Sequence, residues 1–444
     1  MDIKVYPGKL TGAVQAPPSK SLAHRALICA ALSDGESRIR GISGSKDMDA
    51  TIGCIRALGA RVERAGTECR IRGIFADAQD PSGNGERPAA AKEEPVLDCI
   101  ESGSTLRFLL PVAAALGAES SFTGRGKLPE RPMTPLADEM KKKGVEFLPD
   151  GRDHLPFRIR GKLQPGRFTI PGNVSSQYIS GLLFALPLLE GNSEIYISGK
   201  LESASYIALT LAMLREFGIE VRETADGFTV PGGQKYRSGD CEVEGDHSNG
   251  AFWLAAGAMG SDLEIYGLNT DSAQGDRAVL EILRSLGGGC IESTATGPDP
   301  GKYIHAFAGS MKGMKVDCSD IPDLVPILSV AATAAEGETL FCNAGRLRIK
   351  ESDRLAAMAE VLTALGAGVT ENEDSLAVRG SSLQGGCEVD GHNDHRIVMS
   401  AAIAALCCRE PVVIRGAEAV TKSYPDFFDR FRELGGRADV IADR

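Results

Sequence analysis

A glycine that ends a helix, followed by a short polar hairpin, recurs six times along this chain, and this repeat limits the possible folds more than any other feature. Three copies are RALGARVERAGTECRIRG (56–73), REFGIEVRETADGFTVPG (215–232) and TALGAGVTENEDSLAVRG (363–380). The six glycines lie about 70 to 85 residues apart, at Gly59, Gly144, Gly218, Gly287, Gly366 and Gly435. Glycine is typical of the left-handed residue after a helix, and the alternating polarity that follows predicts strands. A period of this length indicates repeated supersecondary units.

Each repeat also contains an earlier helix that is apolar on all sides and polar at its head. These helices are expected over 19–32, 101–116, 173–189, 246–259, 320–335 and 393–406. Helices of this kind are buried, and their amino termini attract anions through free N–H groups and the helix dipole. The pattern predicts an α/β protein with six β-α-β-α-β-β units, three in each of two domains. Segment 79–95 breaks the period and is expected to be an exposed insertion.

Composition and charge exclude several classes of function. A chain of 444 residues is too long for one core and favours two domains. The net charge of −11 argues against a nucleic-acid partner or an anionic membrane surface. The apolar runs are shorter than the ~20 residues that span a bilayer. The amino terminus does not resemble a signal peptide, and the 11 cysteines show no zinc-ligand spacing. We therefore expect a cytoplasmic protein with reduced thiols.

Motifs for common cofactors are missing as well. The sequence contains no GxxxxGK[ST], no GxGxxG after a strand and no HExxH. We therefore expect no nucleotide, no nicotinamide or flavin cofactor and no zinc-dependent hydrolysis. His392 and His395 in HNDHR superficially suggest a metal site, but they have no further ligand at a recognised spacing, so no metal is expected.

The helix heads of the first half carry groups that suit anions and hydroxyls. Lys20, Ser21 and Arg25 open the first helix, and SGSTLR (102–107) opens the second. A basic loop, TGRGKLPERPMTP (123–135), follows the second helix in the same repeat. The third head, NVSSQY (173–178), offers hydroxyls and an amide. For each group the alternative is an ordinary cap or a solvated charge. Cations at a helix amino terminus oppose the dipole, however, and a bound phosphate would reverse that effect.

The heads of the second half add carboxylates. Asp323 lies at the start of a very apolar helix, where it is either a helix cap or a partly buried general base. In RLRIKESDR (346–354), Lys350 and Arg354 are expected on one face of a helix, with Glu351 between them. A helix start with ion pairs is the alternative. Lys422 precedes a further helix in VTKSYPDFF.

Together these segments resemble a known family. PSKSLAHRAL, GNVSSQYISGLL, DIPDLVPILSV, RLRIKESDRL, NDHRIVMSAA and TKSYPDFF are similar to the EPSP synthase family of enolpyruvyl transferases, over nearly the whole chain. The resemblance implies two inside-out α/β domains of three βαβαββ repeats each, with a cleft between them. Residues 1–18 and 245–444 would form the C-terminal domain, and 19–244 the N-terminal domain.

The same resemblance implies an activity in the shikimate pathway of aromatic amino-acid biosynthesis. A monomeric transferase would move the enolpyruvyl group of phosphoenolpyruvate to the 5-hydroxyl of shikimate 3-phosphate, and glyphosate, a phosphoenolpyruvate analogue, would target it. The phosphoshikimate ligands would be Lys20, Ser21, Arg25, Ser175, Ser176, Gln177, Ser203, Asp323 and Lys350, with Tyr206 beside them. The phosphoenolpyruvate ligands would be Lys20, Gly103, Lys127, Gln177, Arg354, Arg396 and Lys422.

Three residues are expected to take part in the chemistry. Asp323 is the hypothetical base for the 5-hydroxyl, Glu351 the acid for C3 of phosphoenolpyruvate, and Lys20 the cation that reaches both substrates. A lysine remains an alternative to Glu351. Lys127 stands where related enzymes have arginine, so Arg125 is an alternative clamp. Two other readings are a transferase that uses UDP-N-acetylglucosamine, which would need a loop cysteine, and an anion-binding protein without catalysis.

Overall fold

The computed structural model describes residues 1–79, 94–149, 151, 153–295 and 301–442, and it divides into two compact units. Unit 1 comprises Met1–Ser19 and Glu244–Arg444, and unit 2 comprises Lys20–Val243. These bounds differ by one residue from the domain limits expected above. Most of the expected insertion, residues 80–93, lies outside the described residues. Over the described ranges, no helix is both long and apolar enough to cross a membrane.

Unit 2 contains twelve strands and six α-helices in its described part. The strands are β3 (Glu36–Arg40), β4 (Arg61–Ala65), β5 (Glu68–Arg72), β6 (Val96–Asp98), β7 (Ser120–Thr123), β8 (Glu146–Leu148), β9 (Phe157–Arg160), β10 (Arg167–Pro171), β11 (Ser193–Ser198), β12 (Arg222–Thr224), β13 (Gly227–Val230) and β14 (Cys241–Glu242). The helices are α1 (Lys20–Ala31), α2 (Lys46–Ala57), α3 (Gly103–Leu116), α4 (Thr134–Lys142), α5 (Ser176–Ala185) and α6 (Ala204–Glu216), with 3-10 turns η1 (Ala76–Gln79), η2 (Leu128–Glu130) and η3 (Leu186–Leu188).

Unit 1 is built in the same way. Its strands are β1 (Asp2–Val5), β2 (Thr11–Gln15), β15 (Asp262–Tyr266), β16 (Gly289–Thr294), β17 (Lys302–Phe307), β18 (Lys315–Asp317), β19 (Glu338–Cys342), β20 (Gly368–Asn372), β21 (Ser375–Arg379), β22 (Glu388–Asp390), β23 (Val412–Arg415) and β24 (Ala438–Ala442). Its helices are α7 (His247–Ala258), α8 (Ala278–Leu286), α9 (Val325–Thr333), α10 (Arg354–Ala364), α11 (His395–Leu406) and α12 (Phe427–Glu433), with η4 (Gly275–Arg277), η5 (Pro322–Leu324), η6 (Gly345–Ile349) and η7 (Ala417–Lys422).

The strands form three four-stranded sheets in each unit, with one topology. Unit 2 has the orders β14-β3-β5-β4, β6-β7-β9-β8 and β10-β11-β13-β12, and unit 1 has β16-β17-β15-β2, β18-β19-β21-β20 and β22-β23-β1-β24. Within the middle sheet of unit 2, β6 and β7 are parallel around α3, whereas β9 pairs antiparallel with β7 and β8. The predicted β-α-β-α-β-β repeat is therefore confirmed. Strand β1, at the start of the chain, completes the sheet of the last repeat.

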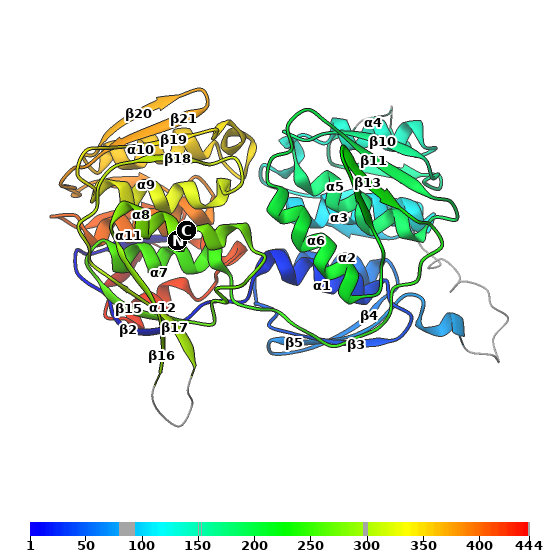
Figure 1. The fold of residues 1–444 in the computed structure, drawn as a ribbon, viewed down its shortest axis with the longest axis horizontal. Helices are drawn as coiled ribbons and strands as arrows, with labels where there is room; N and C mark the ends of the chain where they lie inside the picture. Colours follow the sequence, from blue (N-terminus) through cyan, green and yellow to red (C-terminus); the bar gives the residue numbers. More distant parts are fainter. Residues whose placement is uncertain (80–93, 150, 152, 296–300, 443–444) are drawn as a thin grey trace. The chain divides into compact units, whose positions relative to one another are not determined.

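The predicted apolar helices form the core of each unit. Every residue of α7 and of α11 is buried, and α1, α3, α5 and α9 are buried along most of their length. In Figure 1 the strands β10, β11 and β13 lie outside α3 and α5 within unit 2. All six repeat glycines have positive φ, between 77° and 110°, as the sequence predicts for residues after a helix.

A short polar turn leads from the first strand of a repeat to the buried helix. Asp98 ends β6, and its Oδ1 accepts a hydrogen bond from the Ile100 N–H at 2.9 Å. Asp317 at the end of β18 and Asp390 at the end of β22 bond the second following N–H in the same way. Such side chains stabilise tight turns, so each helix head begins a few residues beyond the sheet edge.

Candidate functional site

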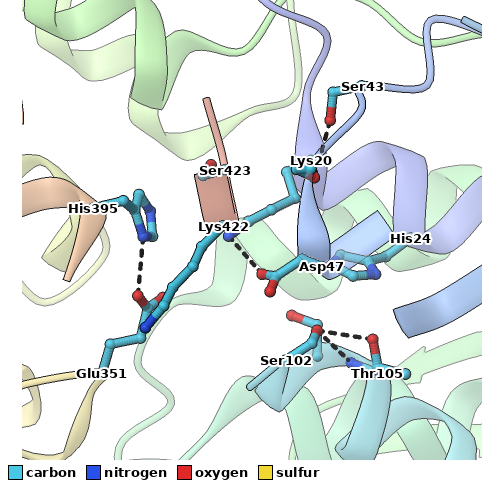
Figure 2. A network of polar contacts seen from close by, with 12 residues as sticks. Lys20, His24, Ser43, Asp47, Ser102, Thr105, Glu351, His395, Lys422 and Ser423 are labelled. Atoms are coloured by element: carbon cyan, nitrogen blue, oxygen red, sulfur yellow. Dashed lines mark hydrogen bonds and ion pairs between the residues drawn. The ribbon is translucent and has the colours of Figure 1, made fainter. Parts of the chain in front are cut away.

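The head of α1 is held to α2 by a buried ion pair. Lys20, the first residue of α1, places its Nζ 2.9 Å from Oδ2 of Asp47, and both side chains are largely buried (Figure 2). Asp47 lies in the first turn of α2, where a negative charge suits the helix dipole. The sequence analysis missed Asp47 because it considered only the apolar helices. The acidic first turn KDMD of α2 is the signal that could have found it.

Arg25 joins α1 to α6. Its Nε donates to Oγ1 of Thr210 at 2.9 Å, and its Nη2 donates to the carbonyl of Tyr206 at 2.8 Å. The guanidinium also lies over the Phe108 ring, 5.2 Å from its centre. Burial lowers the pKa of Arg25 to about 10, so it keeps its charge at neutral pH. Arg25 is therefore a fixed cation beside Tyr206.

The heads of α3 and α5 share a polar cluster. Gln177 Oε1 accepts from Nη1 of Arg107 at 2.8 Å, and its Nε2 donates to Oγ of Ser104 at 2.8 Å. Arg107 is buried, and burial together with the nearby Arg131 lowers its pKa to about 9. A Cβ on Gly103 would lie 2.5 Å from Nη1 of Arg131 and 2.8 Å from Nη1 of Arg107, so any other residue there would displace these guanidinium groups. Two guanidinium groups thus meet at the start of α3, an arrangement that suits an anion.

The other predicted ligands of unit 2 lie at the same kind of position. Ser175 caps α5, and its Oγ accepts from the Gln177 N–H; Ser176 is the buried first residue of that helix. Ser203 precedes α6 with a φ of 56° and is buried, and Ser21 follows Lys20 in α1.

The basic loop does not decide between Lys127 and Arg125. Lys127 is exposed, and within the described residues no hydrogen bond or ion pair joins it to the other predicted ligands. Arg125 is exposed too, and its Nη2 lies 2.9 Å from Oδ2 of Asp98. The loop residue that lies against Gly103 is instead the half-buried Arg131.

In unit 1, three cations surround the carboxylate of Asp323. Oδ1 lies 2.9 Å from Nη1 of Arg354 and 3.4 Å from Nζ of Lys350. Oδ2 lies 3.3 Å from Nη2 of Arg396, whose Nη1 also donates to the Asp323 carbonyl. The cap positions of η5 and α9 are taken by Ile321 and Leu324, and Asp323 lies inside η5. The interpretation of Asp323 as a mere helix cap is therefore wrong.

The expectation that Lys350 and Arg354 share one helical face is also wrong. η6 ends at Ile349, Lys350 follows with φ −85° and ψ −153°, and α10 begins only at Arg354. Asp353 caps α10 by accepting the Ala356 N–H at 3.1 Å. A capping aspartate needs extended backbone, which breaks the helix between the two cations. They meet at Asp323 because the non-helical turn brings them together.

Glu351 belongs to a buried network that includes His395. The Nδ1 of His395 lies 2.9 Å from Oε2 of Glu351 (Figure 2). Asp394 is bound by Arg354 through Nε at 2.7 Å, and Arg354 Nη2 lies 3.6 Å from Glu351. Burial lowers the pKa of Arg354, but the charges of Asp394, Asp323 and Glu351 outweigh it and raise that pKa. His395 was considered only as a metal ligand, although its place at the head of α11 is a signal for a role at the site.

The same network provides the one candidate metal group found among the described residues. Ligand atoms of Glu351, Asp394 and His395 all lie within 4.8 Å of one another. Arg354 already forms ion pairs with both carboxylates. A divalent cation would have to compete with that guanidinium, so the group suits proton transfer better than metal binding.

Two further residues complete the cluster of unit 1. Lys422 ends η7, is buried, and donates from Nζ to the carbonyl of Asn393 at 2.6 Å. Asp276, in η4, is buried as well. Burial and then the charge of Asp323 raise the pKa of Asp276 to about 7, although Arg396 acts in the opposite direction. The sequence analysis missed Asp276 because η4 lies outside the apolar helices.

Each unit therefore presents a cluster of fixed charges at its helix heads. The cluster of unit 2 is mostly cationic and is rich in hydroxyl and amide groups. The cluster of unit 1 pairs carboxylates with cations, which suits general acid–base chemistry.

Comparison with known proteins identifies a family for this architecture. The family model described as EPSP synthase (3-phosphoshikimate 1-carboxyvinyltransferase) matches residues 5–431. A Clostridioides difficile protein of the name 3-phosphoshikimate 1-carboxyvinyltransferase is 44% identical over 439 residues, 98% of each chain. Among solved structures, EPSP synthase from Acinetobacter baumannii is similar with a TM-score of 0.79 and 27% identity, over 99% of this chain and 100% of that one. The enolpyruvyl transferase NikO from Streptomyces tendae, 19% identical with a TM-score of 0.74, covers 99% of this chain with 98% of its own and shares the fold.

Proposed function

We propose how the residues of this chain, which belongs to the EPSP synthase (3-phosphoshikimate 1-carboxyvinyltransferase) family, perform the family's reaction. That reaction transfers the enolpyruvyl group of phosphoenolpyruvate to the 5-hydroxyl of shikimate 3-phosphate and releases phosphate. Both substrates are polyanions, so several fixed cations must offset their charge. The observation that carries the assignment is the Asp323 carboxylate held among Arg354, Lys350 and Arg396.

Unit 2 would bind shikimate 3-phosphate. Lys20 and Arg25 supply the charge for its phosphate, and Ser175, Ser176 and Ser203 supply hydroxyl donors at the heads of two helices. A phosphate at a helix amino terminus also gains from the unpaired N–H groups and the dipole. Ser21, Gln177 and Tyr206 would contact the rest of the ligand.

Unit 1 would supply the chemistry. Glu351 donates a proton to C3 of phosphoenolpyruvate. Asp323 accepts the proton of the 5-hydroxyl while the hydroxyl oxygen forms a bond to C2. The product is a tetrahedral ketal. The bond from C2 to the phosphate oxygen then breaks, and C3 returns its proton as the double bond forms. His395, hydrogen-bonded to Glu351, is suited to pass that proton on.

Phosphoenolpyruvate would be held from both units. Arg354, Arg396 and Lys422 of unit 1 would face its phosphate and carboxylate, and Lys20, Gly103, Lys127 and Gln177 of unit 2 would complete the site. Lys350 would bind a ring hydroxyl of the phosphoshikimate together with Asp323. We expect the site to close on the substrates and exclude water.

The role of Asp323 is tested by its replacement with alanine. Asp323→Ala should lower kcat by roughly 10²–10⁴ and leave the Kd of shikimate 3-phosphate largely unchanged, because the base is lost but the cations of unit 2 remain. Phosphate release with both substrates and calorimetry with phosphoshikimate measure the two quantities. Asp429→Asn, at an exposed aspartate, is the control. Near-normal turnover of Asp323→Ala would refute the role.

We also propose that the enzyme acts as a monomer in the cytoplasm. The described cysteines are free thiols, which suits a reducing compartment. Light scattering with and without the substrates tests the monomer. Glyphosate added to the phosphate-release assay tests competition with phosphoenolpyruvate.

A further inference from the structure

Four buried side chains connect α1, α2 and α3 of unit 2 through hydrogen bonds. His24 Nδ1 lies 2.7 Å from Oγ1 of Thr51 in α2, which lies 2.7 Å from Oγ1 of Thr105 in α3. Thr105 Oγ1 donates to Oγ of Ser102 at 2.8 Å (Figure 2). His24, Thr51, Thr105 and Ser102 are all at most 1% exposed. Buried polar groups that are fully satisfied hold one arrangement, so the series fixes how α1, α2 and α3 meet.

The hydrogen bonds have one consistent direction. Thr105 donates its only hydroxyl hydrogen to Ser102, so in the bond between the two threonines Thr51 is the donor. The other acceptor near the Thr51 hydroxyl, the Asp47 carbonyl, lies farther away, at 3.3 Å, than Thr105 Oγ1 does, at 2.7 Å. Thr51 then accepts from His24, and the histidine carries its hydrogen on Nδ1. The described residues offer Nε2 of His24 no hydrogen-bond partner, which a bare ring nitrogen tolerates better than a buried N–H.

The surroundings keep His24 neutral. Burial, and then the charges of Lys20 and Arg25 on the same helix, lower the pKa of His24 well below its usual value. Its ring also meets the Phe108 ring edge-on, with centres 6.4 Å apart. The donor on Nδ1 is therefore present throughout the neutral pH range.

The series ends at the cap of α3. Ser102 Oγ accepts from both the N–H and the Oγ1–H of Thr105, so its two acceptor positions are filled. The next residue is Gly103, where the guanidinium groups of Arg107 and Arg131 approach most closely. A shift of the cap would move the Gly103 backbone relative to both guanidinium groups.

We propose that His24, Thr51 and Thr105 are positioning residues that align the Ser102–Gly103 turn for phosphoenolpyruvate through a one-way series of hydrogen bonds. The assignment rests on the proposed role of Gly103 in that site. The hydrogen bonds of the Lys20 ammonium to the Asp47 carboxylate and of the Arg25 guanidinium to Thr210 involve none of the three side chains, so loss of the series should weaken phosphoenolpyruvate binding more than phosphoshikimate binding.

Thr51→Val tests the series at its middle, because valine keeps the shape and removes the hydroxyl. KM for phosphoenolpyruvate should rise about fivefold to tenfold, as expected for one lost hydrogen bond, while KM for shikimate 3-phosphate changes less than about twofold. His24→Leu should behave alike. His24→Asn should instead keep KM for phosphoenolpyruvate near the wild-type value, because the asparagine amide N–H lies about where the ring Nδ1–H does. Thr333→Val is the matched control: Thr333 is a buried threonine whose hydroxyl donates to the Val330 carbonyl within α9.

Two outcomes would overturn the proposal and leave the proposed function standing. One is a Thr51→Val enzyme with a lower melting temperature and an unchanged KM for phosphoenolpyruvate, which would make the series merely structural. The other is a ¹⁵N NMR spectrum of the histidine rings in which His24 carries its hydrogen on Nε2. Wild-type enzyme that releases no phosphate from the two substrates would instead overturn the proposed function, and this inference with it.

Discussion

Asp276 is the residue whose charge state the fold alters most clearly. Its carboxyl lies near Asp323 and Arg396 in the cluster of unit 1, and its pKa is raised to about 7, chiefly by burial. An aspartate in the unfolded chain titrates near pH 4. Between these values the folded protein holds a proton that the unfolded chain has lost, so stability falls as pH rises.

Asp276→Asn should remove this dependence, because the amide stays neutral at every pH. Relative to wild type, the free energy of unfolding of the variant should rise by up to a few kcal/mol between pH 5 and pH 8 and then level off. Urea unfolding at the two pH values measures it, with Asp429→Asn as the exposed control. A difference between variant and wild type that is the same at both pH values would contradict the assignment.

Arg25 tests how far a guanidinium differs from an ammonium at this site. Arg25→Lys keeps the charge but loses the bonds to Thr210 and to the Tyr206 carbonyl. We expect KM for shikimate 3-phosphate to rise about 10-fold or more and stability to fall by about 1–3 kcal/mol. Steady-state kinetics and urea unfolding check both, and Arg222→Lys at an exposed strand is the control. Unchanged kinetics in Arg25→Lys would remove it from the ligand set.

Residues whose roles depend on their own helix were predictable, and residues that act across the fold were not. The cap at Ser175 and the cations Lys20 and Arg25 follow from one segment each. Asp47 pairs with Lys20 from 27 residues away, and His395 meets Glu351 across 44 residues. No local pattern carries such a pairing, because it is set by how the repeats pack.

The positions at which helices start and end are set by local chemistry. The repeat glycines were predictable because a positive φ after a helix favours glycine. The start of α10 was misplaced because the charge pattern of KESDR was given more weight than the capping aspartate before RLAAMAE.

Close packing of α3 on α5 depends on one glycine. A Cβ on Gly181 would lie 2.1 Å from the Arg107 carbonyl oxygen, whereas a Cβ on Gly53 in α2 would meet nothing within 4 Å. Gly181→Ala should therefore cost about 3 kcal/mol or more, and Gly53→Ala should stabilise by roughly 0.5–1 kcal/mol. Urea unfolding compares the two. Equal effects would contradict the packing described for the two helices.

At the scale of the molecule, the net charge of the chain is opposite in sign to the charge at the helix heads of unit 2. The chain carries −11, yet the head of α1 and the neighbouring heads of unit 2 are cationic. If phosphoshikimate neutralises these cations and draws the two units together, X-ray scattering should give a smaller radius of gyration with the ligand than without it. Identical profiles would count against closure.

The α/β class, the repeat and the apolar helices followed from periodicity, because a buried helix has apolar residues in every turn. Contacts between helices, such as that of Lys20 with Asp47, did not follow, since no single segment of the sequence encodes them.

The central claim is that helix heads of both units act on the same phosphoenolpyruvate. The most direct test compares Lys20→Met in unit 2, Arg396→Met in unit 1 and the double variant by phosphate release. Each single change should lower kcat/KM for phosphoenolpyruvate by about 100-fold or more, and the double change should cost less than the product of the two, because both cations contact one ligand. A wild-type kcat/KM in either single variant would contradict the claim.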